Sequence, residues 1–423
     1  MRFKPFSAWR PRPDLAAQVA SPPYDVVTRD EAARLAQGNP LSFLHVGRSD
    51  IDLSPDVDPH DPRVYATARS NLDRLMRDGV LVHDARPAFY LYQLTMHGRS
   101  QLGVVGCVHI DDYAADVIRK HEKTRKDKED DRTRHVLTLN ANAEPVFLTF
   151  RDDPRLAQRL AQGTRGPALY DFMAPDGVRH QVWEASDTAP WVEAFATVPH
   201  AYVADGHHRC ASAWRAGEEI RAQHGEPGAE GEYAWFLAVL FPASQLRILP
   251  YHRVVRDLNR LSPEQFLERL GEVGWVEPVA DPEPPGPGSF GWYLNGRWYR
   301  LTLDRATIPS NDPIRSLDAV LLEERILGPI LGIGDIRTDN RVDFVGGIRG
   351  TPELQRRVDS GEMALAVALY PVTVEQLMAV SDAGQIMPPK TTWFEPKLRS
   401  GLFVHSLDEP VQSPPSRLPS PVL

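Results

Sequence analysis

One short segment, residues 201–214, constrains the fold of this chain more than any other. It runs from an apolar tetrapeptide, Ala-Tyr-Val-Ala, through Asp205 and Gly206 to an alanine-containing stretch typical of a helix. The pattern predicts a short buried strand, a tight turn and a helix start, and such a junction directs free backbone N–H groups to one point. Gly206 lets the backbone approach a ligand closely, because it has no side chain and accepts positive φ.

The side chains around this turn suit an anion. His207, His208 and Arg209 add donors where the positive end of the helix dipole already favours negative charge. Asp205 is a candidate ligand for a magnesium ion beside the same phosphates. We interpret the segment as a phosphate or nucleotide site. The alternative is a plain strand-to-helix connection whose histidines only cap the helix, although two histidines and an arginine in a row are uncommon as buried packing residues.

Size and composition indicate a globular protein with more than one core. A chain of 423 residues predicts two or three domains. No apolar run reaches the roughly 20 residues that cross a bilayer, and the N-terminus lacks the pattern of a secretory signal, so we expect a cytoplasmic protein without a membrane partner. Cys107 and Cys210 are the only cysteines, which argues against a disulfide framework and a cysteine-built zinc site. The net charge of −9 argues against a surface that recruits nucleic acid as a whole.

Strand and helix signals divide the chain into regions. Apolar β-rich runs, of which residues 235–241 are the most continuous, predict a central mixed sheet from about Val104 to Phe241. A Pro/Gly-rich linker precedes a hairpin around Asn295-Gly296. The expected fold class is α+β. Its parts are an N-terminal α+β region (1–100), a nucleotide- or phosphate-binding core (101–245), a C-terminal α+β region (246–400) and a largely disordered proline-rich tail (401–423).

A charge-dense segment, residues 119–135, is a second candidate for chemistry. On composition it predicts a solvated helix with i,i+4 ion pairs. Combined with the turn at 205–209, however, Glu122 becomes a candidate general base. Candidate phosphate ligands in the segment are Lys123, Thr124, Arg125, Arg132 and Arg134. A metal site through His121 and His135 is disfavoured, because their separation is not a usual ligand spacing on a helix.

Two loops are candidates for substrate contacts. Asn140 and Asn142 precede a strand, and their amides either read a small ligand or only form turns. The proline-stiffened segment 387–397 presents Lys390 and Lys397, and it either closes over a substrate anion or docks the C-terminus onto the core. The sequence has no phosphate loop, complete dinucleotide fingerprint or nucleophile elbow.

Four sequence blocks together resemble a known family. Over nearly its whole length the chain is similar to a widespread bacterial and archaeal family of unknown function. The shared blocks are Ser-Pro-Pro-Tyr-Asp-Val at 21–26, His-Glu-Lys-Thr at 121–124, Asp-Gly-His-His-Arg at 205–209 and Met-Pro-Pro-Lys at 387–390. This resemblance brings no established activity with it.

Residues 201–214 by themselves resemble the phosphate-binding box of the ParB-like and sulfiredoxin superfamily, in which free serine kinases pair such a box with an upstream His-Glu. The resemblance implies a ParB-like or sulfiredoxin-like unit within the central sheet. It also implies that Glu122 activates a substrate hydroxyl with His121 as its companion, and that Asp205 to Arg209 hold the phosphates and the metal. About 80 residues separate Glu122 from Asp205, more than in the compact kinases, so we expect a substrate-shaping insertion between them.

The leading hypothesis is a nucleotide-dependent phosphotransferase. It would use ATP or ADP with Mg²⁺ and act on a small hydroxyl metabolite such as free serine, or run in reverse on phosphoserine. The expected catalytic residues are Glu122, His121 and Asp205, with Asp205 also as the metal ligand. The expected nucleotide-binding residues are Gly206, His207, His208, Arg209, Lys123, Thr124, Arg125 and Arg134, and the expected substrate-binding residues are Asn140, Asn142 and Lys390.

Two hypotheses of other classes stay open. A non-catalytic ParB-like nucleotide-binding switch predicts saturable nucleotide binding and a change of oligomeric state, such as a homodimer, without turnover. A nucleic-acid-binding or nuclease role draws on the basic residues between Arg119 and Arg134. The net acidity, the lack of stacking aromatics around that segment and the lack of a basic recognition helix count against it.

Overall fold

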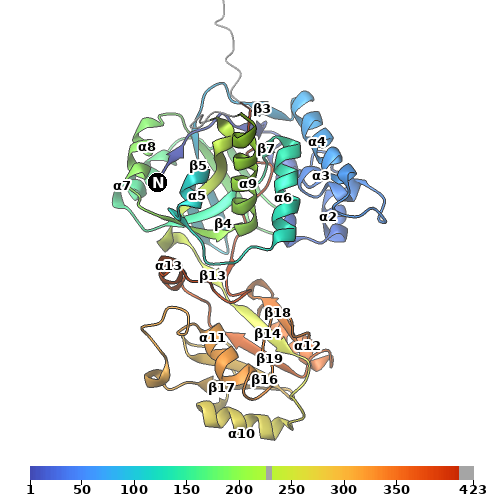
Figure 1. The fold of residues 1–423 in the computed structure, drawn as a ribbon, viewed down its shortest axis with the longest axis vertical. Helices are drawn as coiled ribbons and strands as arrows, with labels where there is room; N and C mark the ends of the chain where they lie inside the picture. Colours follow the sequence, from blue (N-terminus) through green and yellow to red (C-terminus); the bar gives the residue numbers. More distant parts are fainter. Residues whose placement is uncertain (225–230, 409–423) are drawn as a thin grey trace, which may run out of the picture.

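The computed structural model describes residues 1–224 and 231–408, which form two lobes, one above the other in Figure 1. The main lobe is built on a nine-stranded mixed sheet, and the second lobe on a six-stranded antiparallel sheet. The chain is therefore an α+β protein, as the sequence predicted.

The main sheet draws its strands from residues 3 to 242. In spatial order they are β6 (Ile118–Arg119), β11 (Ala201–Asp205), β8 (Val146–Phe150), β12 (Trp235–Pro242), β5 (Arg99–His109), β4 (Phe89–Met96), β10 (Arg179–Ala185) and β9 (Tyr170–Met173), with β1 (Phe3–Lys4) paired to β5. β11 runs parallel to β6 and β12 runs parallel to β8, which makes the sheet mixed. β4 and β5 pair across residue 100, so the regions expected as 1–100 and 101–245 share one sheet.

The strand β12 shows why this sheet forms. Its side chains alternate between two hydrophobic clusters: Leu237 and Val239 belong to one, and Phe236 and Ala238 to the other. Successive side chains of a strand point to opposite faces, so both faces of β12 are covered. This double burial explains the unbroken apolar run, and the predicted central strand at 235–241 is confirmed.

Helices pack around the main sheet. α9 (His207–His224) and α6 (Lys126–Leu139) lie side by side, and α4 (Pro62–Arg77) packs on α6 (Figure 1). The other helical segments of this lobe are α1 (Ala16–Val19), η1 (Tyr24–Val26), α2 (Arg29–Ala36), α3 (Leu44–Gly47), η2 (Ser49–Asp52), α5 (Ile110–Ala114), α7 (Pro154–Gly163), α8 (Ala189–Ala196), η3 (Glu232–Ala234) and η4 (Ala243–Gln245). A small pair of strands, β2 (Trp9–Pro11) and β3 (Leu81–His83), closes the N-terminal part.

The second lobe packs helices on both faces of its sheet. Its strand order is β15 (Trp275–Pro278), β17 (Arg297–Thr302), β16 (Ser289–Leu294), β19 (Leu365–Leu369), β14 (Tyr251–Val255) and β18 (Val342–Gly346). One face carries α10 (Pro263–Val273), α11 (Asp318–Leu322) and the π-helical turn η6 (Glu323–Leu327), and the other carries α12 (Gly350–Asp359). The short 3-10 turns are η5 (Arg305–Thr307) and η7 (Gly347–Arg349). The predicted hairpin is the β16–β17 turn, where Asn295 and Gly296 both have positive φ.

The last described segment returns to the main lobe. The ribbon of β13 (Ile248–Leu249) and β20 (Trp393–Phe394) joins the lobes, and α13 (Val374–Asp382) packs into the main-lobe core. Leu402 and Phe403 are buried in that core, and β21 (His405–Ser406) pairs with β7 (Ala141–Asn142). The first part of the expected tail, 401–408, is thus packed, and residues 409–423 lie outside the described residues.

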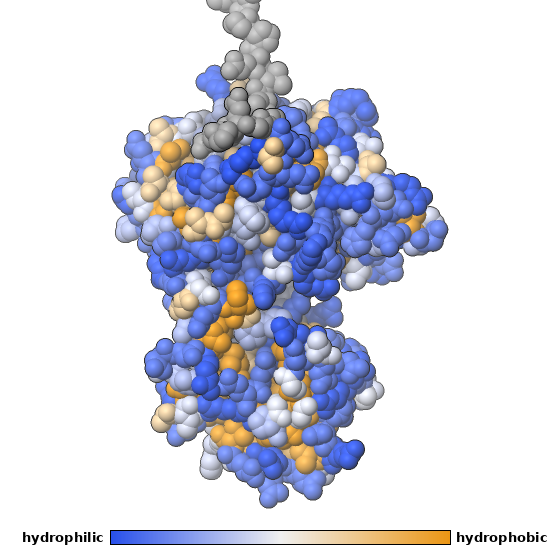
Figure 2. All heavy atoms as spheres, in the orientation of Figure 1, coloured by the Kyte–Doolittle hydropathy of each residue, from blue (hydrophilic) through white to orange (hydrophobic). Residues whose placement is uncertain are grey.

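The surface differs between the lobes. Figure 2 shows hydrophilic residues over most of the main lobe on this face, and hydrophobic residues exposed on the second lobe below the junction. Within the described ranges, no helix has the length and apolar character needed to span a bilayer.

Candidate active site

The strand-to-helix junction lies where the sequence predicted it. β11 ends at Asp205, Gly206 has φ +92°, and α9 begins at His207. The pairing of β11 with β8 shifts register between Val203 and Asp205, and such irregularities redirect side chains near functional sites. Gly206 is required here for two reasons: its φ is left-handed, and a Cβ would lie 3.0 Å from Nε of Arg209.

Arg209 points into the protein. Its Nη1 donates to the carbonyl of Pro145 at 2.6 Å, and its Nη2 donates to Oδ2 of Asp205 at 3.1 Å and lies 3.6 Å from Oδ2 of Asp25. Burial would lower the pKa of Arg209, but Asp25, Asp205 and Glu144 outweigh it and raise the pKa above its usual value. Arg209 was expected to hold phosphates; its observed contacts position Asp205 and the Tyr24-Asp25 turn instead.

Asp205 lies between two cations. Besides Arg209, Nζ of Lys397 lies 3.5 Å from its Oδ1. Burial would raise the pKa of Asp205, but Lys397 and Arg209 hold it below the usual value. The carboxylate is therefore ionised and fixed at the start of α9.

His121 and Glu122 meet this junction, so the two distant boxes come together. Oε2 of Glu122 lies 3.9 Å from Nδ1 of His207, and the His121 and His207 rings pack edge to face with centroids 4.4 Å apart. Burial raises the pKa of Glu122, Asp205 raises it further, and Lys390 and Lys397 oppose the shift. The result is an exposed carboxylate with a raised pKa beside a fixed, ionised one.

The three histidines are neutral at neutral pH. Burial lowers the pKa of His121 to about 4. Burial, together with nearby positive charge such as that of Arg209 and Lys120, places the pKa of His207 well below its usual value. Nε2 of His207 is buried without a hydrogen-bond partner among the described residues. Burial also lowers the pKa of His208, whose Nε2 accepts from the backbone N–H of Arg125 at 3.1 Å. His208 thus anchors the 121–125 connection to α9.

The connection itself differs from the helix predicted over 119–135. Residues 118–119 form β6, and α6 begins only at Lys126. Thr124 donates to Glu129, and Arg125 pairs with Asp127 at 2.8 Å in an exposed position. These side-chain contacts hold the connection against the first turns of α6, and α6 itself is only partly solvated because it packs on α9 and α4.

The other expected ligands occupy different places. Lys123 is exposed beside Glu122, whereas the guanidinium of Arg134 lies 4.5 Å from the Tyr65 ring, against α4. Asn140 ends α6 with φ +48° and donates to Asp408 at 2.6 Å, and Asn142 is buried in β7. These two asparagines therefore support the β7–β21 strand pair and the residues after it, and within the described residues neither asparagine hydrogen-bonds to Glu122 or Asp205.

Lys390 does reach the site. It is exposed, has φ +55°, and acts electrostatically on Glu122. The backbone N–H of Met387 donates to the carbonyl of His121 at 2.8 Å, so the Met-Pro-Pro-Lys block is attached to the His-Glu block. The loop makes contacts of both kinds that were considered: Lys390 and Lys397 lie near the carboxylates, and Met387 and Phe394 are buried in the main-lobe core.

Two acidic residues beneath the junction, Asp25 and Glu144, were not among the predicted site residues, whereas Arg132, predicted as a phosphate ligand, lines the same cavity as Glu144. Glu144 is buried, and burial raises its pKa although Arg132 and Arg209 oppose the shift. The Arg132 guanidinium stacks on the Tyr24 ring at 4.2 Å. Glu144 and both arginines line an interior cavity of about 20 Å³, enough for one water molecule. The rigid Pro-Pro-Tyr-Asp turn was a visible signal, but nothing in the sequence indicated its partners.

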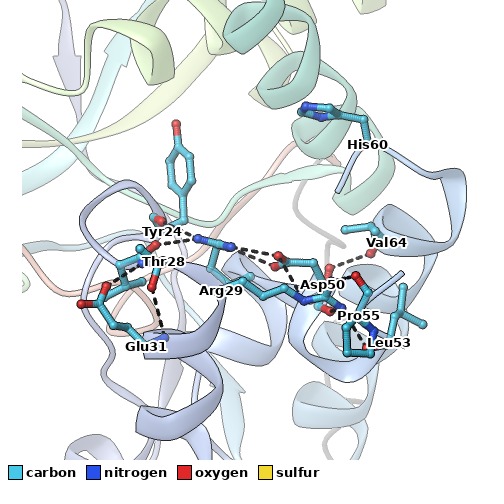
Figure 3. Close-up of polar contacts among 12 residues, drawn as sticks. Tyr24, Thr28, Arg29, Glu31, Asp50, Leu53, Pro55, His60 and Val64 are labelled. Atoms are coloured by element: carbon cyan, nitrogen blue, oxygen red, sulfur yellow. Dashed lines mark hydrogen bonds and ion pairs between the residues drawn. The ribbon is translucent and has the colours of Figure 1, made fainter. Parts of the chain in front are cut away.

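A polar network holds this turn in place (Figure 3). Arg29 donates to four main-chain carbonyls within residues 50–55, those of Asp50, Leu53, Ser54 and Pro55, at 2.6 to 2.9 Å. Arg48 pairs with Asp50 at 2.8 Å and donates to the carbonyl of Val27 at 2.6 Å. Main-chain carbonyls satisfied in this way hold the segment from Tyr24 to Arg29 against residues 48–55.

Metal-ligand geometry is limited in the part of the chain that the structure describes. No group of three or more His, Cys, Asp or Glu residues there is arranged to hold an ion. Mg²⁺ commonly takes one or two protein carboxylates and completes its shell with phosphate and water. Asp205, with Glu122 nearby, fits that smaller requirement.

The family model described as protein of unknown function (DUF1015) matches residues 3–320. The chain belongs to the DUF1015 family. This confirms the resemblance carried by the four sequence blocks. No curated protein matches the chain.

Solved structures similar to this DUF1015 protein share little sequence with it. A free serine kinase in complex with AMP is 13% identical, with 70% of this chain and 90% of that chain covered and a TM-score of 0.33. SbnI with a C-terminal truncation from Staphylococcus aureus is 12% identical, with 71% and 87% covered and a TM-score of 0.37. A conserved hypothetical protein from Pyrococcus furiosus is 12% identical, with 70% and 93% covered and a TM-score of 0.33. These likenesses are too distant to carry a functional argument.

Proposed function

We propose that this protein is a nucleotide-dependent phosphotransferase acting on a small hydroxyl metabolite. The observation that supports it is the convergence of two carboxylates, Glu122 and Asp205, with two lysines, Lys390 and Lys397, at the N-terminus of α9. These groups come from sequence blocks far apart in the chain. Phosphoryl transfer requires a carboxylate that can accept the proton of the attacking hydroxyl. It also requires positive groups, here the lysines and the helix N-terminus, that can hold the phosphates.

Glu122 is the proposed general base. Its side chain is exposed, so a substrate hydroxyl can reach it, and its raised pKa makes it a better proton acceptor than an ordinary glutamate. The hydroxyl oxygen attacks the terminal phosphorus, a new O–P bond forms, and the bond to the nucleotide's bridging oxygen breaks. The proton passes to Glu122, and the shortened nucleotide leaves with the electron pair.

The phosphates are proposed to lie over Gly206 and the first turn of α9. Backbone N–H groups and the helix dipole favour negative charge there, and Lys390 and Lys397 add positive charge. Arg209 acts indirectly, since it orients Asp205 from below. A Mg²⁺ ion held by Asp205 and the phosphates would neutralise charge on the transferred group.

Product formation tests this proposal. Purified protein is incubated with ATP or ADP, Mg²⁺ and a panel of hydroxyl metabolites that begins with free serine, and phosphorylated product is followed by ³¹P NMR. Glu122→Gln should lower turnover by roughly 10²- to 10⁴-fold, because it removes the base. The control is Glu272→Gln, an exposed glutamate on α10, which should retain full activity.

Turnover retained in full by both Glu122→Gln and Asp205→Asn would refute the site assignment. Saturable nucleotide binding without any turnover would favour the non-catalytic switch over an enzyme. If the forward assay yields phosphoserine, incubation of phosphoserine with ADP or AMP tests the reverse reaction.

A further inference from the structure

Two aromatic rings at the lobe junction contact the two lysines of the candidate site. Tyr251 begins β14 and Trp393 begins β20, and their ring centroids lie 5.4 Å apart in an edge-to-face arrangement. Both side chains are only partly buried. Together they form an aromatic surface beside β13, because β14 directly follows β13 and β20 pairs with it.

The same two lysines connect this aromatic surface to the carboxylates. Nζ of Lys397 lies 5.1 Å from the Trp393 ring centroid and 3.5 Å from Oδ1 of Asp205. Nζ of Lys390 lies 5.7 Å from the Tyr251 ring centroid and acts on Glu122. The aromatic surface is therefore one lysine side chain away from each carboxylate.

The rings are held firmly from behind. The indole Nε1 of Trp393 donates to Glu395 at 2.8 Å, and Gly346 leaves room for the indole, since a Cβ there would come within 2.8 Å of it. Buried Arg253 donates to the Tyr251 carbonyl at 2.7 Å and stacks on Phe344. A rigid aromatic surface loses little entropy when a planar ligand stacks on it.

We propose that Tyr251 and Trp393 form the stacking surface for the base of a nucleoside di- or triphosphate whose phosphates lie at the start of α9. This inference rests on the proposed function and adds the second lobe to the binding site. The base takes the places of the two ammonium groups over the rings, and Lys390 and Lys397 move to the phosphates. Stacking of a base on an aromatic ring contributes about 1–3 kcal/mol, or roughly 5- to 150-fold in affinity, at least as much as a typical cation–π contact, and the displaced ammonium groups gain the phosphates as partners.

Comparing two ligands tests the proposal. Isothermal titration calorimetry of the full chain, with Mg²⁺ in the buffer, measures its affinity for ATP and for inorganic tripolyphosphate. Tripolyphosphate has the three phosphates but no nucleoside. Wild type should bind ATP more tightly than tripolyphosphate. Trp393→Leu and Tyr251→Leu should each weaken ATP binding by roughly 5- to 150-fold and leave tripolyphosphate binding unchanged. The control Trp275→Leu, at a 71% exposed tryptophan on the far strand β15, should change neither affinity.

The conservative Trp393→Phe variant keeps a ring and guards against loss of folding. ATP should quench tryptophan fluorescence of the wild type more than tripolyphosphate does, and this difference should vanish in Trp393→Phe while ATP still binds. If ATP binds no more tightly than tripolyphosphate, or if the leucine variants weaken both ligands equally, the stacking surface is wrong and the phosphate site stands. If neither ligand binds the wild type, the proposed function fails together with this inference.

Discussion

Replacing Arg209 by methionine should destabilise the main lobe strongly. Arg209 is 7% exposed and neutralises Asp205 and Asp25 while it satisfies the Pro145 carbonyl. Removing one partner of a buried charge pair costs about 3–5 kcal/mol, because the charge left behind is uncompensated. For a unit of this size, such a loss lowers the melting temperature by on the order of 10 °C.

Arg215→Met provides a control on the same helix. Arg215 pairs with Glu129 at 3.1 Å and Asp130 at 2.6 Å, but its side chain is 31% exposed. Solvent screens such pairs, so we expect a loss of about 1 kcal/mol or less. Thermal unfolding followed by circular dichroism at pH 7 measures both variants.

The pH dependence gives a second readout for Arg209→Met. In the wild type, Arg209 helps to hold the pKa of Asp205 below its usual value, so the carboxylate contributes stability above the unfolded pKa of about 4 and loses it as the pH falls through the folded pKa. Without Arg209 this contribution shrinks, and the pKa of buried Glu144 rises further. The deficit of the variant should therefore be largest at neutral pH and smaller near pH 4 to 5. Equal melting temperatures for Arg209→Met and Arg215→Met at pH 7 would refute the reasoning.

Three further predictions follow from the structure. Gly206→Ala should cost about 1–3 kcal/mol of unfolding free energy through its φ of +92° and the contact with Arg209, whereas Gly271→Ala in α10, where a Cβ meets nothing within 4 Å, should be neutral or stabilising by melting temperature. Because burial raises the pKa of Glu122, the rate of phosphoryl transfer should fall on acidification with a midpoint above the usual glutamate value of about 4.3, and a pH–rate profile with no midpoint in that range would contradict its role as base. Burial raises the pKa of Asp318 to about 7, so its contribution to stability is present below about pH 4 and is lost as the pH rises towards 7; Asp318→Asn should gain stability relative to wild type across this window, and parallel melting curves at all pH values would contradict it.

Local signals in the sequence predicted the parts of the fold that depend on neighbouring residues. The apolar run of β12 and the Asn295-Gly296 turn were both read from a few adjacent positions. The Asp205-Gly206 junction was found for the same reason, since a strand, a turn and a helix start follow one another there.

The rest of the site depends on contacts between distant segments. The charge pattern at 119–135 predicted a helix over the whole segment. In the structure β11 pairs with residues 118–119, and the backbone N–H of Met387 donates to the His121 carbonyl. These tertiary contacts keep the first residues of the segment extended. Glu144 and Asp25 belong to the site only because the fold brings both carboxylates close to Arg209. Hydrophobic periodicity reports local secondary structure, so it does not predict contacts between segments that are distant in the sequence.

The chain crosses between the lobes twice, at β13 and between β19 and α13, and the two crossings are adjacent because β14 pairs with β19. The second lobe is thus an excursion of the main-lobe chain, anchored at both ends. Two adjacent tethers restrict relative movement of the lobes mainly to rotation about one line, as a hinge does. Any movement of Tyr251 relative to Glu122 would follow a single arc, so a disulfide meant to hold the protein at one point on it has to join the two lobes at a distance from that line.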